Sequence, residues 1–140
     1  PQPSYLRLDK SSKFKIHSTL PKVYPGKWIK IFNNKNNKEI YLTTGSVIDY
    51  AKKNLIKKKL YSLYSVPIWS MKSKVKQFHE IKKYKKITVV EDHFQDGGFA
   101  SWINESTNNK NNTTKIISKS ISSSVTNAVG SKDYLMRYLR

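Results

Sequence analysis

A short apolar run near the middle of the chain, Ile87–Val90 (ITVV), constrains the fold more than any other feature. Residues on both faces of this run are suited to burial, as in a strand that is covered from above and below. Strands of that kind occur in mainly parallel sheets with helices on both sides. The run therefore predicts a strand of an α/β domain that is buried on both faces and does not lie at an edge of the sheet.

Four further segments have the length and apolar spacing of strands, and helical patterns alternate with them from Ile40 onward. The five predicted strands are Trp28–Phe32, Ile40–Thr43, Tyr61–Val66, Ile87–Val90 and Ile116–Ile121. Only a short turn joins the first to the second, so the first is predicted to be antiparallel. The others require crossover helices and should be parallel. We expect a three-layer α/β/α domain whose five-stranded sheet is mostly parallel with one antiparallel strand.

Four helices are expected around these strands. Ser46 is predicted to cap the first, which has an apolar stripe of Val47, Ile48, Ala51, Leu55 and Ile56. The second carries Val75, Phe78 and Ile81, the third begins after Gly97-Gly98 and carries Phe99, Trp102 and Ile103, and the last is Ser131–Leu139, capped by Ser131.

The segment Glu91-Asp92-His93 follows the predicted buried strand, at the end of a strand where α/β folds usually place their chemistry. A metal site would need further convergent ligands, and His17 and His79 have no spacing relation to His93. A serine triad would need a nucleophile elbow, which is absent. The favoured interpretation is structural: acids in such a turn satisfy the N–H groups at the next helix start. Gly97-Gly98 lets the backbone bend there and is also compatible with a bound anion, although it is not a G-x-G-x-x-G motif.

The net charge of +18 raises the question of an anionic partner. Only Arg7, Arg137 and Arg140 are arginine among the 27 basic residues, although arginine supplies the bidentate contacts to bases and phosphates. Asparagine-lysine tracts such as Asn33–Lys38 are typical of an AT-rich coding sequence. We therefore expect a solvated lysine surface and no nucleic-acid partner, with a lysine-rich module that binds nucleic acid or another polyanion as the alternative.

The 140-residue length fits one core, and no apolar run is long enough to span a membrane. The chain contains no cysteine, so disulfides and thiolate metal sites are excluded. It begins with Pro1-Gln2-Pro3 rather than methionine, without a signal peptide. We expect a cytoplasmic protein and a fragment of a longer chain.

Five motifs in the same order resemble the transketolase family. Pro3–Leu8 (PSYLRL) resembles the last strand of its pyrimidine-binding domain, and the others resemble its C-terminal domain: Ile40–Val47 (IYLTTGSV), Ser65–Ile68 (SVPI), the E-D-H and G-G pair at residues 91–98, and Val129–Leu135 (VGSKDYL). The resemblance implies that residues 1–25 are the end of the pyrimidine-binding domain and a linker, and that residues 26–140 are a transketolase C-terminal domain. The asparagine-rich Asn108–Thr114 and the Ile68-Trp69 pair depart from the family pattern.

The resemblance also implies a parent enzyme that transfers two-carbon ketol units between sugar phosphates, with thiamine diphosphate and a divalent metal (Mg²⁺ or Ca²⁺). The family's G-D-G metal and diphosphate motif is absent from this chain, so no cofactor and no catalytic or metal-binding residue is expected in it. The expected partners are the remaining domains or subunit of the parent enzyme, in a homodimer. Glu91, Asp92, His93, Gly97 and Gly98 are then expected at an interface or at the active-site rim.

Overall fold

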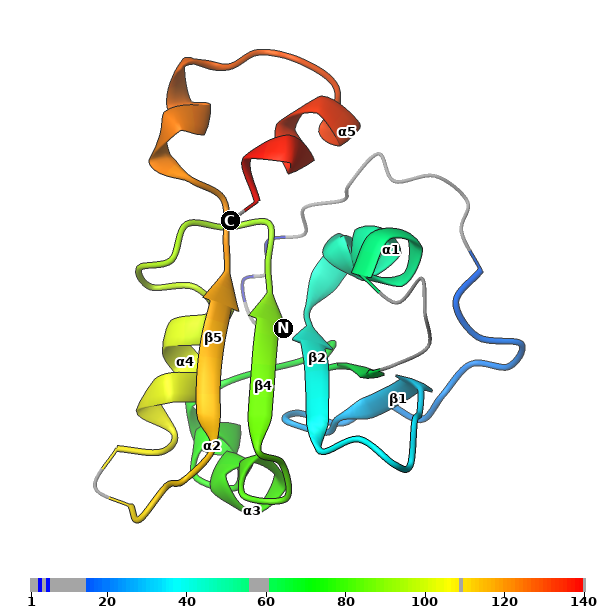
Figure 1. Cartoon of the computed structure of the whole chain (residues 1–140), viewed down its shortest axis with the longest axis vertical. Coiled ribbons are helices and arrows are strands. Elements are labelled where there is room, and N and C mark those ends of the chain that lie inside the picture. Colours follow the sequence, from blue (N-terminus) through cyan, green and yellow to red (C-terminus); the bar gives the residue numbers. More distant parts are fainter. Residues whose placement is uncertain (1–2, 4, 6–14, 56–60, 109, 140) are drawn as a thin grey trace.

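The computed structural model describes residues 3, 5, 15–55, 61–108 and 110–139. Their strands form one sheet in the order β1-β3-β2-β4-β5 (Figure 1): β1 Ile29–Phe32, β2 Glu39–Thr43, β3 Ser62–Ser65, β4 Lys86–Val90 and β5 Lys115–Lys119. Strands β2 to β5 are parallel to one another, and β1 is antiparallel to β3. This confirms the α/β fold with one antiparallel strand and an interior position for β4. The strand expected at Pro3–Leu8 lies almost wholly outside the described residues.

The partner of β1 differs from the expectation of a simple hairpin. β1 pairs with β3, and Ile29 lies opposite Ser65, because both sides of β2 are occupied by the parallel strands β3 and β4. The turn from β1 to β2 passes over the start of β3. Ser62 Oγ accepts a hydrogen bond of 2.9 Å from the Asn34 N–H and donates one of 3.2 Å to Asn33 Oδ1. β1 is therefore antiparallel, as predicted, but its partner is β3, and the short turn passes over the start of β3 on its way to β2.

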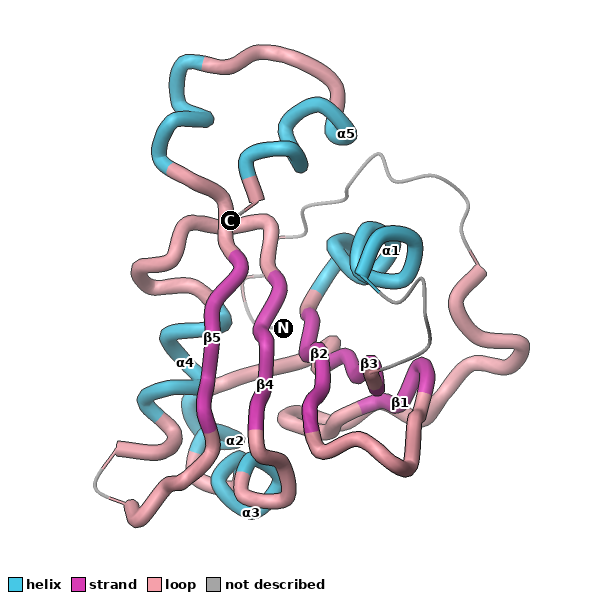
Figure 2. The backbone as a smooth tube through the Cα atoms, viewed as in Figure 1, coloured by secondary structure: helices cyan, strands magenta, loops and turns pink. Residues whose placement is uncertain are grey.

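Helical segments cover both faces of the sheet (Figure 2). They are η1 Gly45–Val47, α1 Ile48–Tyr50, the π-helical η2 Ala51–Leu55, α2 Met71–Lys74, α3 Gln77–Ile81, α4 Phe99–Glu105, η3 Ser123–Asn127, α5 Lys132–Leu135 and η4 Met136–Tyr138. The continuous segment η1-α1-η2 packs on Leu63 and Tyr41 on one face. α4 and the end of α3 pack on the opposite face, which gives the three expected layers.

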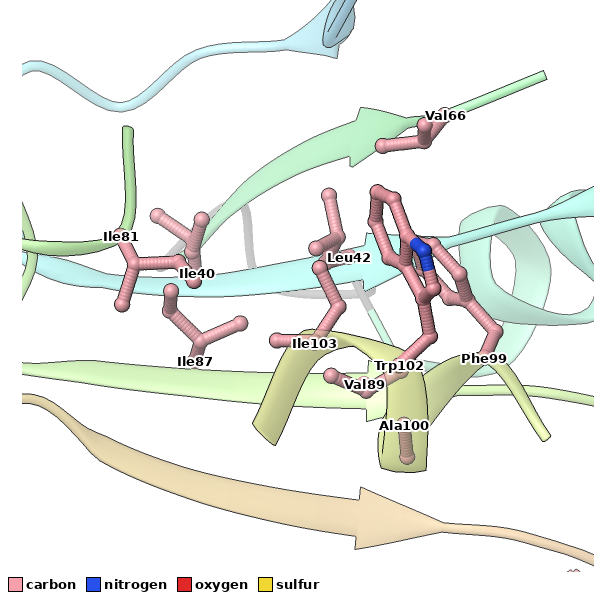
Figure 3. Packing of buried hydrophobic residues seen from close by; sticks show 10 residues of the cluster. All are labelled: Ile40, Leu42, Val66, Ile81, Ile87, Val89, Phe99, Ala100, Trp102 and Ile103. Atoms are coloured by element: carbon pink, nitrogen blue, oxygen red, sulfur yellow. The ribbon is translucent and has the colours of Figure 1, made fainter. Parts of the chain in front are cut away.

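The main core lies between the sheet and α4 (Figure 3). Alternate residues of β2 and β4 point toward this helix, because successive side chains of a strand face opposite sides of the sheet. Its fully buried members are Ile40, Leu42, Val66, Ile81, Ile87, Val89, Phe99, Ala100, Trp102 and Ile103. Phe99 and Trp102 stack with ring centroids 5.7 Å apart. The helix predicted after Gly97-Gly98 is thus present and carries the predicted core residues.

The helix predicted around Val75 is instead two short helices, whose buried residues are the polar Ser73 and Gln77 and the predicted Ile81. Val75 is 72% exposed, whereas Gln77 is 1% exposed. The Gln77 side chain accepts a hydrogen bond of 2.7 Å from Trp28 Nε1 and donates to the carbonyl oxygens of Gly26 (3.1 Å) and Ser73 (3.0 Å). Apolar spacing could not reveal this, because Gln77 is buried by its hydrogen-bond partners and not by hydrophobicity.

We predict that Gln77→Leu lowers the free energy of unfolding by about 1–3 kcal/mol, because the Trp28 indole N–H and the Gly26 carbonyl lose the side chain that they bond to inside the protein. Leucine is close to glutamine in volume, so the loss reports hydrogen bonding rather than a cavity. His79→Leu, at an exposed position of the same helix, should change the value by no more than about 0.5 kcal/mol. Urea unfolding of both variants measures these changes. Equal losses of unfolding free energy in Gln77→Leu and His79→Leu would contradict the role assigned to the hydrogen bonds of Gln77.

Candidate functional site

The helical connections that follow β2 and β4 lie on opposite faces of the sheet. β2 is followed by η1-α1-η2 on one face, and β4, its neighbour, is followed by α4 on the other. In open α/β sheets a crevice forms at the carboxyl ends of two such strands, and ligands commonly bind there. In this chain that position lies between residues 44–46, which follow β2, and residues 91–93, which follow β4. The predicted site residues therefore lie at the position where this fold class usually has its chemistry.

Glu91 points into the protein and caps α4. Its side chain is 1% exposed, and its carboxylate accepts hydrogen bonds from the N–H groups of Phe99 (2.6 Å) and Ala100 (3.2 Å). Burial raises the pKa of Glu91 above its ordinary value, while the hydrogen bonds from Ala100 and Phe99 act in the opposite direction. This is the helix-start role that sequence reasoning favoured for an acid of this turn.

The two glycines of the turn have different reasons to be glycine. Gly97 has φ of 71°, a left-handed conformation that other residues adopt at a cost. Gly98 has an ordinary φ of −85°, but a Cβ there would overlap the Glu91 carboxylate and would lie 2.9 Å from the Phe94 carbonyl oxygen. Gly98 is needed because the Glu91 carboxylate approaches its backbone so closely.

Asp92 takes part in an exposed polar contact across the crevice. Ser46 Oγ donates a hydrogen bond of 3.1 Å to Asp92 Oδ2 and accepts one of 2.8 Å from Lys132 Nζ. The prediction that Ser46 caps the first helix is therefore wrong: the helical segment begins at Gly45, with Thr44 before it, and no side chain caps it. The Ser46 hydroxyl instead links β2, β4 and the C-terminal segment.

His93 is exposed and does not approach Glu91 or Asp92 in a catalytic arrangement. Its Nδ1 lies 3.0 Å from the carbonyl oxygen of Phe94, the next residue. The His93 backbone carbonyl accepts a hydrogen bond of 2.9 Å from the Ile121 N–H, which fastens the turn to the segment after β5. The imidazole has neither a carboxylate that orients it nor a nucleophile beside it among these contacts, so the geometry supports no Ser-His-Asp chemistry.

The C-terminal segment covers this edge of the sheet (Figure 1). Met136 is buried against Val47 and Val90, the residues that follow β2 and end β4. Ser131 caps α5 as predicted, since its side chain accepts a hydrogen bond from the Tyr134 N–H. The predicted helix Ser131–Leu139 is present as α5 followed by the 3-10 helix η4, and it ends at Tyr138, where Leu139 forms an isolated bridge with Ile121. The C-terminal segment thus covers the region between the ends of β2 and β4 with an apolar side chain.

The described residues contain no group of three or more His, Cys, Asp or Glu side chains that could hold a metal ion. A diphosphate-bound metal needs several oxygen ligands, and here Glu91 is committed to backbone N–H groups while Asp92 lies on the surface. The residues of this edge consequently do not fit thiamine diphosphate with its metal. What the arrangement can do is hold a rigid turn at the surface.

Two surface features near this edge were not predicted. A mainly apolar pocket of about 270 Å³ lies beside β1 and the start of η1, and its lining includes Ile16, His17, Ile29, Ile48 and Ser65. Large side chains are also exposed on the loops that leave β3 and β4: Ile68 is 45%, Phe94 42% and Trp69 38% exposed. Apolar spacing within one segment gives no signal for either feature, because both depend on which segments meet in space.

Comparison with known proteins supports the fold and does not establish a family. No protein-family model and no curated protein matches the sequence. A solved structure described as a split-gene transketolase, an inactive beta4 tetramer, resembles this chain with a TM-score of 0.61 and 15% identity, over 89% of this chain and 40% of that chain. The chain therefore has a transketolase-like fold and spans less than half the length of that neighbour. Among the described residues, no helix is long and apolar enough to cross a membrane.

We predict that Gly98→Val lowers the free energy of unfolding by about 1–3 kcal/mol, because the new side chain displaces the Glu91 carboxylate from the start of α4. His93→Ala should cost less than about 1 kcal/mol, since the imidazole is exposed. Denaturant unfolding of both variants tests the order. A larger loss for His93→Ala would contradict the structural role assigned to this turn and would indicate a polar network around the histidine.

Glu91 should also make stability depend on pH. Its folded-state pKa is raised, so above the unfolded-state value of about 4.3 the folded protein retains a proton that the unfolded chain has lost. The stabilisation from this group is complete below that pH and is lost as the pH rises through the folded pKa. The free energy of unfolding of the wild type, minus that of Glu91→Gln, should therefore decrease from about pH 4 toward neutrality. A difference that is constant or that increases with pH would refute this.

Proposed function

We propose that this chain is the C-terminal domain of a transketolase-like thiamine-diphosphate enzyme, with residues 1–25 as the end of its pyrimidine-binding domain and a linker. The observation that carries the proposal is the likeness to a transketolase over 89% of the chain. Two of the motifs that suggested the family support it, because each lies at the junction of a strand and a helix, as the resemblance implies. Thr44-Gly45-Ser46 begins the helix after β2, and Glu91 through Gly98 form the strand-to-helix turn after β4.

In this proposal the domain contributes to assembly and to the rim of the active site, and it does not carry out the reaction. Glu91 serves the fold, and Asp92 and His93 are exposed on a turn that Gly98 and the Glu91 cap hold in one conformation. A rigid exposed turn is suited to contact with another domain or subunit. Thiamine diphosphate and its metal would be held by the rest of the parent enzyme. The homodimer and the cytoplasmic location expected from the sequence remain predictions.

The exposed side chains after β3 and β4 support a role in assembly. Ile68 and Trp69 follow β3, Phe94 follows β4, and Trp69 is anchored on Phe99 with ring centroids 5.6 Å apart. Aromatic residues held on a rigid base are typical of the central part of protein interfaces. The neighbouring structure is described as a tetramer, which is compatible with a domain that contacts other subunits.

We predict that Ile68→Lys in the parent enzyme weakens its assembly by about tenfold or more, because a charge is placed in the apolar contact. Val75→Lys is the matched control: Val75 is even more exposed, at 72%, but lies between α2 and α3, away from the loops after β3 and β4. Analytical ultracentrifugation across a dilution series measures assembly, and circular dichroism checks that both variants fold. Assembly that is unchanged in Ile68→Lys, or equally weakened in both variants, would contradict the proposal.

A further inference from the structure

In the described part of the chain, the loops at one end of the sheet are rich in lysine and those at the other end are not. The described segments that lead into β2, β4 and β5, residues 33–38, 82–86 and 110–115, contain eight lysines: Lys35, Lys38, Lys82, Lys83, Lys85, Lys86, Lys110 and Lys115. Acids lie directly beside them at Glu39, which begins β2, and at Glu80 in α3. The segments that leave the parallel strands, residues 44–47, 66–70, 91–98 and 120–131, contain three acids and no lysine or arginine, although Lys119 ends β5 and Lys132 donates a hydrogen bond to Ser46 at this end of the sheet. Codon usage that fills solvated positions with lysine has no reason to distinguish the two ends.

The backbone brings three of these lysines together. The Lys85 N–H donates a hydrogen bond of 2.9 Å to the Lys38 carbonyl, and the Lys115 N–H donates one of 2.9 Å to the Lys85 carbonyl. Lys38, Lys85 and Lys115 therefore precede or begin three adjacent strands, which are spaced about 4.8 Å apart. All three are exposed. The entering loops lie along one end of the sheet (Figure 2). We call this surface, residues 33–38, 82–86 and 110–115, the lysine edge.

Few of these charges are neutralised within the protein. Lys86 pairs with Glu39, and Lys83 pairs with Glu80. Within the described part of the chain, Lys38, Lys85 and Lys115 form no ion pair with a carboxylate. Like charges held side by side repel one another, and a bound polyanion relieves that repulsion. The lysine edge is consequently a concentrated positive surface, and no described carboxylate pairs with its three central lysines.

The composition of the lysine edge indicates the kind of anion. None of the large exposed hydrophobic side chains of the described residues belongs to it, so it lacks the apolar centre of a protein interface and the apolar anchors of a membrane surface. Asparagines interleave the lysines at residues 33, 34, 36, 37, 111 and 112, and asparagine amides, like lysines, commonly contact phosphate and sugar. Lysine acts as a point charge and does not supply the bidentate contact by which arginine reads guanine.

We propose that the lysine edge binds the phosphate backbone of nucleic acid without sequence preference, as a second activity at the end of the sheet opposite the turn of Glu91. This binding does not depend on the transketolase-like role, because it uses different residues. The sequence led us to expect lysines that are simply solvated, whereas this proposal assigns a binding role to the lysines at one end of the sheet. Contacts made by lysine alone imply an affinity that falls steeply with salt, since each neutralised phosphate releases counterions.

The test is fluorescence anisotropy of a labelled single-stranded oligonucleotide of mixed sequence, titrated with the chain between about 50 mM and 200 mM salt. The triple variant Lys38→Gln, Lys85→Gln and Lys115→Gln should lower the slope of log affinity against log salt by about 2, at about 0.7 for each phosphate that is no longer neutralised. Its affinity at the lowest salt should fall by about tenfold or more. A homopolymer should bind the wild type as well as the mixed sequence does.

The control is a triple variant with the same reduction of charge at exposed lysines outside the lysine edge: Lys22→Gln, Lys30→Gln and Lys52→Gln. It should keep the wild-type slope. Equal reductions of the slope in both triple variants would show that only net charge matters and would overturn the proposal. Absence of binding at the lowest salt would also overturn the proposal. The same holds if vesicles of phosphatidylcholine and phosphatidylserine displace the labelled oligonucleotide more effectively than unlabelled oligonucleotide does. Circular dichroism of both variants excludes unfolding as the cause of any weakened binding.

Discussion

A buried carboxylate directly after the interior strand β4 organises the turn that leads into α4. Glu91 accepts hydrogen bonds from the Phe99 and Ala100 N–H groups, so the chain must reverse from β4 into α4 within a fixed distance. The same helix supplies Phe99 and Trp102 to the main core. An uncompensated carboxylate in that position would be costly, and the two N–H groups would otherwise lack partners at the helix start. Gly98 permits the arrangement because it has no side chain where the carboxylate lies.

Glu91 lies where this class of fold commonly binds a ligand, but its side chain is used to start α4. The crevice between β2 and β4 is where a ligand would be expected in an open α/β sheet. In this chain Glu91 points into the protein, and Ser46 forms hydrogen bonds with Asp92 and Lys132. Met136 from the C-terminal segment packs against Val47 and Val90. The sheet thus has the strand order of ligand-binding α/β folds, but the residues between the ends of β2 and β4 contact one another. What remains for partners is the outer surface: aromatic loops at one end of the sheet and lysines at the other.

The sequence predicted the features that depend on local pattern. The apolar run Ile87–Val90 was sufficient to place an interior strand, and Ser131 was recognisable as a helix cap because its partner lies three residues away. Features that depend on distant segments were missed. Nothing near β1 indicates that it pairs with β3 rather than β2, and nothing near Gln77 indicates the indole of Trp28. Ser46 had the sequence of a cap, but its hydroxyl is used by Asp92 and Lys132, which lie far away in sequence.

The central claim, that Glu91 holds the turn by capping α4, can be tested by amide hydrogen exchange. In the wild type, the Phe99 and Ala100 amides should be protected although they belong to the first turn of a helix, where N–H groups have no partner within the helix. Glu91→Ala should lower their protection by about tenfold or more relative to the Trp102 amide, which donates to the Gly98 carbonyl and serves as internal reference. Rapid exchange of both amides in the wild type, or protection that is unchanged in the variant, would contradict the account.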